Sequence, residues 1–234
     1  MTDSIGLAFN LVRHFDAALW QVVALSLRVS GLACLIGALV GLWLGTWLAV
    51  ARFPGHAVAV WMLNTLLALP SVVVGLLVYL LLSRAGPLGS LGILFTPTAM
   101  VIAQSVLVVP LMAALTRRLV TDALQDGGDQ LRSLGASPMQ TGALLLLHER
   151  LGVLTIVLTA FGRAIAEVGA VMVVGGNIDG FTRVMTTSIA LETSKGDLPL
   201  ALALGFLLLA VVALVNLLIA AMQGRTALRG AAWA

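Results

Sequence analysis

Charged residues are scarce in this chain of 234 residues. They make up 10% of the sequence and hydrophobic residues make up 60%, whereas a typical soluble domain has about 25% charged and roughly 45–50% apolar residues. So few charges cannot cover a water-soluble globule, which excludes a soluble enzyme. The net charge is only +3. The basic residues are scattered between apolar blocks, which is typical of membrane flanks and not of a nucleic-acid-binding patch.

Groups that could hold a metal or perform catalysis are also few. The single cysteine, Cys34, excludes an intrachain disulfide and a cysteine metal cluster, and the three histidines lie in separate segments. Residues 175–182 match the glycine and threonine spacing of a phosphate-binding loop, but Phe181 stands where that loop needs lysine. We therefore expect no metal, no cofactor and no catalytic residue.

Five apolar runs are long enough to cross a membrane as helices. A hydrocarbon core of roughly 30 Å needs about 20 helical residues, and these runs do not alternate with the period of a strand. They are residues 20–50, 57–82, 98–115, 151–174 and 198–222. The sequence therefore predicts an all-α polytopic membrane protein with about five transmembrane helices, in which the first run is retained rather than cleaved.

The distribution of basic residues predicts the orientation. If residues 116–150 are cytoplasmic, seven arginines lie inside, against three arginines and one lysine outside, as the positive-inside rule requires. Residues 1–19 then form an extracytoplasmic or interfacial segment, 20–222 the membrane domain and 223–234 a cytoplasmic tail. The N-terminus is expected outside and the C-terminus inside.

Some residues inside these runs are unusual for lipid. Arg163 and Glu167 are four residues apart, on one helical face. A charge at membrane depth costs at least about 2.5–3.5 kcal/mol, so the pair either pins two helices together or lies near a pore or gate. Prolines at positions 70 and 110 are expected to kink their helices. A stripe of small residues predicts close packing against another helix, in this chain or in a second copy: Gly37, Gly41 and Gly45.

The polar segment 116–150 is not needed for spanning. It is expected to form a helix, a turn and a second helix, because Gly135 suits a helix end and Ser137-Pro138 suits a helix start. A compact projection of this kind favours docking of a partner protein.

The same segment carries a family motif. Asp129-Gln130-Leu131-x3-Gly135-x9-Leu145-x-Leu147 resembles the coupling-loop motif E-A-A-x3-G-x9-I-x-L-P of binding-protein-dependent ABC importer permeases. Asp129 replaces glutamate, two larger residues replace the alanines and His148 replaces the proline, while the Gly-Ala-Ser-Pro core is intact. The resemblance implies that this loop couples the chain to an ATPase, through Asp129, Gly135, Ala136, Ser137 and Pro138.

A second stretch resembles the oxyanion branch of that family. It starts at Arg163 and includes Val-Gly-Gly-Asn-Ile, Thr-Arg-Val-Met-Thr-Thr and Leu-Glu-Thr-Ser-Lys-Gly-Asp. This run is most similar to tungstate permeases, and molybdate permeases share its outline. The resemblance covers about residues 20–222. It implies a type I ABC importer transmembrane domain in the cytoplasmic (inner) membrane, which imports an oxyanion, tungstate first and molybdate next.

The resemblance also implies an assembly. A homodimer would surround one path, two separate subunits would hydrolyse ATP, an extracytoplasmic binding protein would deliver the oxyanion, and lipid would surround the spans. The candidate pore or gate residues are Arg163, Glu167, Asn177 and Arg183. A dianion would be attracted by Arg183 and by the backbone amides of the turn 175–180, although a membrane-flanking arginine needs no such role.

Two other classes of protein remain as alternatives. A secondary transporter or channel for anions would work without an ATPase and would be favoured by inverted repeats, into which five spans do not divide. An intramembrane enzyme would need convergent catalytic groups, and Arg163 with Glu167 is the single buried titratable pair in the expected spans.

Overall fold

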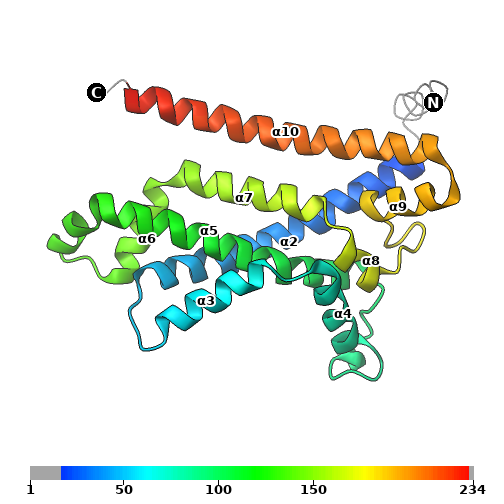
Figure 1. Ribbon diagram of the computed structural model, residues 1–234, viewed down its shortest axis with the longest axis horizontal. Coiled ribbons are helices and arrows are strands. Elements are labelled where there is room, and N and C mark those ends of the chain that lie inside the picture. The colour runs from blue at the N-terminus through cyan, green and yellow to red at the C-terminus, as the bar shows by residue number, and fades with distance from the viewer. Residues whose placement is uncertain (1–16, 232–234) are drawn as a thin grey trace. The chain divides into compact units, whose positions relative to one another are not determined.

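The computed structural model describes the backbone of residues 17–231 and the side chains of residues 19–223 (Figure 1). Most of the expected N-terminal segment 1–19 lies outside these residues. Within them every regular element is a helix. The elements are α2 (Ala17–Val50), α3 (His56–Leu67), α4 (Ser71–Leu82), η1 (Gly89–Leu91), α5 (Pro97–Ser133), α6 (Pro138–His148), α7 (Arg150–Ile165), α8 (Gly169–Gly175), α9 (Met185–Lys195) and α10 (Leu198–Ala231).

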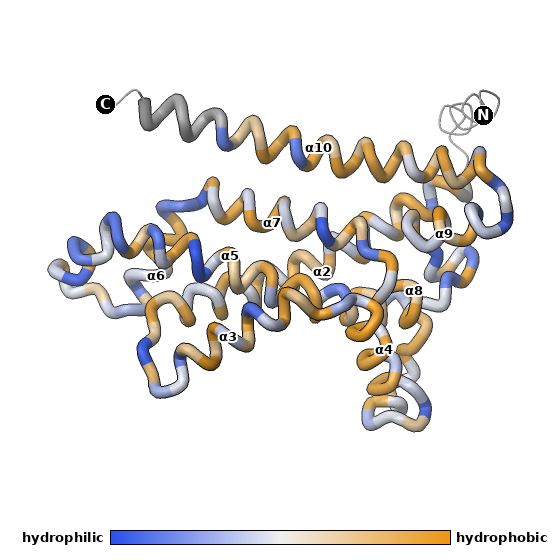
Figure 2. Tube along the Cα trace, in the orientation of Figure 1, coloured by the Kyte–Doolittle hydropathy of each residue, from blue (hydrophilic) through white to orange (hydrophobic). Residues whose placement is uncertain are grey.

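The number of candidate spans, three to five, includes the predicted five, although one of the five joins α6 to α7 whereas the predicted run 151–174 covers α7 and α8. Three helices, α2, α5 and α10, are long and apolar enough to cross a membrane alone, and two bent pairs raise the number to as many as five. The pair α3 and α4 bends by 100°, and the pair α6 and α7 bends by 79°. Figure 2 shows α4 and the first half of α10 as almost uniformly apolar, and the turn between α5 and α6 as polar.

The structure changes three details of the predicted spans. The kink expected at Pro70 is confirmed and is a full break: Pro70 adopts an extended conformation (φ −63°, ψ 128°) at the N-terminus of α4, so the run 57–82 forms two helices bent by 100°. The run 151–174 is broken after Ile165. The third span and the first helix of the projection are one helix of 37 residues, in which Pro110 makes no break. A proline inside a membrane helix is tolerated where neighbouring groups satisfy the backbone.

The chain divides into two compact units that each draw on three segments. Unit 1 contains the chain up to Ala33, with Pro70–Val106 and Gly162–Leu214, and unit 2 contains Cys34–Leu69, Leu107–Phe161 and the chain from Val215. In unit 1, α4 packs directly on α8: a Cβ on Gly75 would lie 2.8 Å from the Cα of Ala170. Glycine at this position therefore allows the two backbones to touch.

In unit 2 the glycine stripe of α2 packs on α5. A Cβ on Gly37 would lie 2.6 Å from Cγ1 of Val108, and one on Gly41 would lie 2.8 Å from Cβ of Met112. A Cβ on Gly45 would meet the Ala113 carbonyl. The partner that the sequence left open is therefore a helix of the same chain.

Candidate functional sites

The carboxylate of Glu167 is the centre of a buried polar cluster in unit 1. The residue lies between α7 and α8 and is 4% exposed. Nη1 of Arg163 donates to its Oε2 at 2.8 Å, and the Ala170 amide donates to its Oε1 at 3.2 Å. The Ser71 hydroxyl, at the start of α4, also donates to this carboxylate. Three donors from two separate segments therefore compensate the buried charge.

The backbone of the α7–α8 break is satisfied by other elements. The Ala164 carbonyl accepts a hydrogen bond of 2.9 Å from Nε2 of Gln104, on α5. The Glu167 carbonyl accepts one of 2.8 Å from Oγ1 of Thr186, on α9. A broken helix within an apolar span needs such partners, because unpaired backbone groups are costly there. The break is thus a built feature of the fold.

The two members of the predicted ion pair differ in exposure. The side chain of Arg163 is 55% exposed, whereas that of Glu167 is 4% exposed. Since the pair joins positions one helical turn apart, it does not by itself connect two helices. The remaining guanidinium donors of Arg163 lie at the surface of this single chain.

Asn177 and Arg183 lie in the loop between α8 and α9. Asn177 has a positive φ of 51°, and its Nδ2 donates to the Thr187 carbonyl at a long 3.4 Å. Nη1 of Arg183 lies 3.0 Å from Oδ1 of Asp179, and the arginine side chain is 19% exposed against 81% for the aspartate. Its charge is therefore compensated within the loop.

Several amides of this loop are used inside the protein. Of the turn 175–180 that was expected to attract an anion, the Gly176 amide donates to the Met172 carbonyl and the Ile178 amide donates to Oγ1 of Thr182. The amides of Phe181, Thr182 and Arg183, just after that turn, donate to the Ile178 carbonyl. Attraction of an anion by Arg183 and the turn 175–180 stays a prediction.

The turn between α5 and α6 in unit 2 has the caps that its sequence predicts. Gly135 has a φ of 84°, and the Ala136 amide donates to the Leu131 carbonyl at 3.1 Å, which closes α5. Oγ of Ser137 accepts from the Gln140 amide at 3.4 Å, and the Ser137 amide donates to Oε1 of Gln140 at 2.9 Å. This reciprocal pair is a capping box with proline at the first helical position.

One face of α6 is fixed and the other is open. A Cβ on Gly142 would lie 2.6 Å from Cγ2 of Thr46 on α2, and Thr141 is fully buried. Leu134 in the turn and Leu147 on α6 are 83% and 73% exposed. Asp129 is 99% exposed and lies 3.5 Å from Arg132. The turn therefore presents apolar and charged side chains on a rigid base.

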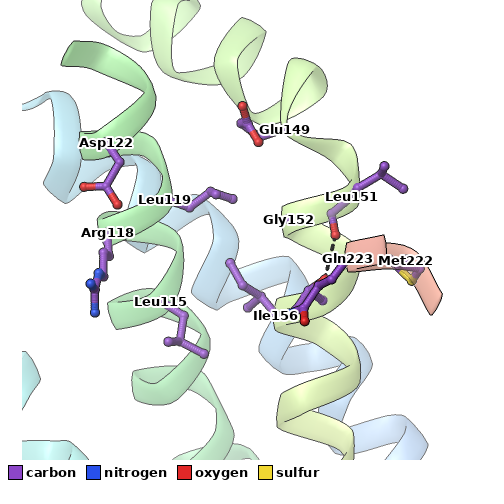
Figure 3. A pocket seen from close by; sticks show the side chains of 11 residues that line it. Leu115, Arg118, Leu119, Asp122, Glu149, Leu151, Gly152, Ile156, Met222 and Gln223 are labelled. Atoms are coloured by element: carbon purple, nitrogen blue, oxygen red, sulfur yellow. Dashed lines mark hydrogen bonds between the residues drawn. The ribbon is translucent and has the colours of Figure 1, made fainter. Parts of the chain in front are cut away.

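A pocket of about 420 Å³ also lies in unit 2, between α5, α7 and the end of the described side chains of α10 (Figure 3). Leu119 points toward α7, where a Cβ on Gly152 would lie 2.9 Å from its Cδ1. Asp122 and Glu149 stand at the margin with Arg118. The pocket has an apolar interior, and its charged lining has two acidic groups and one basic group, which does not favour an oxyanion, so we assign the pocket no part in a path.

Metal ligation finds no support in the part of the chain that the structure describes, since no group of three or more His, Cys, Asp or Glu side chains is close enough to hold an ion. The sequence missed Gln104, Ser71 and Thr186. The signal for Gln104 was an amide inside an apolar run; for the two hydroxyl residues only the three-dimensional arrangement reveals the contact.

Known proteins resemble this chain over most of its length, although no protein-family model matches it. The tungstate uptake system permease protein TupB of Peptoclostridium acidaminophilum is 42% identical over 92% of this chain and 95% of its own. A probable anion ABC transporter permease protein of Haloferax volcanii is 40% identical, over 88% of this chain and 91% of its own. The molybdenum transport system permease protein ModB of Escherichia coli K12 is 31% identical, over 76% and 82%.

Proposed function

Since the chain belongs to the permeases of ABC importers, in the branch of the tungstate and molybdate systems, we propose that it forms the membrane path by which tungstate enters the cell. It is a multi-pass permease subunit, and its relatives favour an ATP-driven importer over a secondary transporter or channel. The observation that carries the choice of tungstate is the 42% identity to a tungstate permease along nearly the whole of both chains, against 31% for a molybdenum permease.

A separate ATPase that binds the α5–α6 turn supplies the energy for transport. Support for this comes from the exposed Leu134 beside Gly135 and from the rigid seating of α6 on α2. Asp129, Gly135, Ala136, Ser137 and Pro138 form the docking element, and residues 116–150 lie in the cytoplasm. The C-terminal tail then lies on the same side, and the N-terminus lies outside, where an extracytoplasmic binding protein delivers the anion.

The path runs between two copies of the chain. Arg163 supports this proposal, because among the described residues only its Nη1 is paired, with Glu167, while the half-exposed guanidinium has further donors that need water or another partner within an apolar span. A path for a dianion supplies both, so we place Arg163 on the path and Glu167 behind it as the group that orients it. Asn177 and Arg183 belong to the outer entrance, where Arg183 meets the anion only if it leaves Asp179.

Uptake by whole cells tests the substrate. A strain that lacks this chain is supplied with tungstate and molybdate together, and intracellular tungsten and molybdenum are measured by mass spectrometry with and without the chain restored. The proposal predicts that the chain restores tungsten accumulation when molybdate is in excess. Equal recovery of both metals, or recovery of molybdenum alone, would refute tungstate as the substrate.

A further inference from the structure

A small chamber inside unit 1 is close to the size that one water molecule needs. The volume available to the centre of a water is about 10 Å³, close to the minimum of roughly 10–15 Å³ that a single buried water needs. Its polar lining comes from α2, α5, the α7–α8 break and α9 and consists of Ser26, Ser30, Gln104, Glu167 and Thr186. Chambers with this lining are usually hydrated, whereas dry cavities are apolar.

One wall of the chamber carries a buried amide oxygen without a partner. Gln104 is 4% exposed, and its Oε1 forms no hydrogen bond with any described residue. The orientation of the amide is fixed, because its Nε2 donates to the Ala164 carbonyl. An unpaired amide oxygen at this depth is costly, and buried polar groups nearly always have a partner.

A hydrogen-bond donor is available from Ser30. This residue is 2% exposed and lines the chamber, so its hydroxyl can donate to a water there. The hydroxyls of Ser26 and Thr186 donate to the carbonyls of Val22 and Glu167, and Oγ of Ser26 also accepts from the Met185 amide, so both can serve a water only as acceptors. A water that donates to Oε1 of Gln104 and to one of these oxygens and accepts from Ser30 makes about three hydrogen bonds, the usual number for a buried water.

We propose that this chamber is a permanent site for one water molecule, held by Oε1 of Gln104 and the hydroxyl of Ser30. The water connects α2 and α5 at the level of the α7–α8 break. Gln104 is then a positioning residue: one end of its amide fixes the Ala164 carbonyl and the other holds the water. This inference does not depend on the transported anion or on the ATPase.

Hydroxyl-radical labelling by X-ray radiolysis tests the site directly, because a bound water generates the radical beside side chains that bulk solvent cannot reach. The full-length chain is purified in detergent with any subunits that remain bound, irradiated and mapped by mass spectrometry. Val29 and Val184 line the chamber and are 2% and 5% exposed. They are expected to be oxidised several-fold faster than Val74 and Val171, which are equally buried at 2% and 1% in the same unit.

A substitution that fills the chamber gives the matched comparison. Ser30→Val removes the hydroxyl and adds bulk, so labelling of Val184 should fall to the level of Val171. Ser105→Val makes the same chemical change at a buried serine that does not line the chamber and should leave labelling of Val184 unchanged. If Ser30→Val fails to fold, the test rests on the unsubstituted protein alone. A ratio near one between the oxidation rates of Val184 and Val171 then overturns the proposal.

Discussion

Nη1 of Arg163 lies 2.8 Å from Oε2 of Glu167, yet the arginine side chain is 55% exposed and the glutamate side chain is 4% exposed. The pair is therefore not symmetrical. The carboxylate occupies a position built for an acceptor, because the Ser71 hydroxyl and the Ala170 amide also donate to it. The arginine occupies a position that touches the outside of the chain.

This asymmetry predicts that exchanging the two residues fails. In Arg163→Glu/Glu167→Arg the opposite charges are retained, but a guanidinium would face two other donors at position 167. Loss of one partner from a buried ion pair costs about 3–5 kcal/mol, and we expect the double exchange to be no more stable than Glu167→Ala. Thermal unfolding in detergent measures this, and a double exchange that melts near the unsubstituted chain contradicts it.

The turn at Gly135 gives a prediction with a matched control. Gly135 and Gly127 both have open space where a Cβ would lie, but only Gly135 has a left-handed φ, of 84°. Gly135→Ala should therefore strain the turn by about 1–2 kcal/mol, whereas Gly127→Ala inside α5 should stabilise the helix by about 0.4–1 kcal/mol.

The measurement for this pair is the amount of ATPase that co-purifies with the tagged chain. We expect a clear loss with Gly135→Ala and none with Gly127→Ala. If both variants retained equal amounts of ATPase, the left-handed turn at Gly135 would not be required for docking of the ATPase.

The contact between α2 and α5 predicts a further difference between glycines. A Cβ on Gly41 would lie 2.8 Å from Cβ of Met112 and 3.0 Å from the Val109 carbonyl, while Gly31 on the same helix has nothing within 4 Å. Gly41→Ala should cost about 1–3 kcal/mol through overpacking, and Gly31→Ala should not destabilise the chain. Melting temperatures of the two variants in one detergent test this, and equal values would argue against close packing at Gly41.

Arg183 and Asp179 form an ion pair. Substituting Asp179 and substituting Arg183 are expected to change the rate of uptake in opposite directions. Freeing the arginine with Asp179→Asn should raise the initial rate at low tungstate, since an uncompensated cation at an entrance attracts anions. Arg183→Gln should lower that rate, with the binding protein kept saturating. Both effects should shrink as salt screens the charges. If Arg183→Gln left the rate of uptake unchanged, Arg183 would be a membrane-flanking arginine with no role at the entrance.

Local chemistry explains which features the sequence could predict. The turn at Gly135 and Ser137 and the pairing of Arg163 with Glu167 depend on residues within four positions of one another, so spacing was sufficient. The α7–α8 break could not be predicted, because it is completed by Gln104, 60 residues away from Ala164. The sequence also could not distinguish the two prolines. Pro70 precedes the first residue of α4 and Pro110 lies inside α5, although each follows an apolar residue in an apolar run.

Continuity of α5 has a consequence for how the polar turn after it is anchored. A helix of 37 residues is about 55 Å long, and α5 is one of the helices long and apolar enough to cross a membrane alone. The polar turns that end at Ser133 therefore extend a candidate span directly, with no loop in between. Any partner that held those turns would hold a membrane helix itself and not a flexible connection.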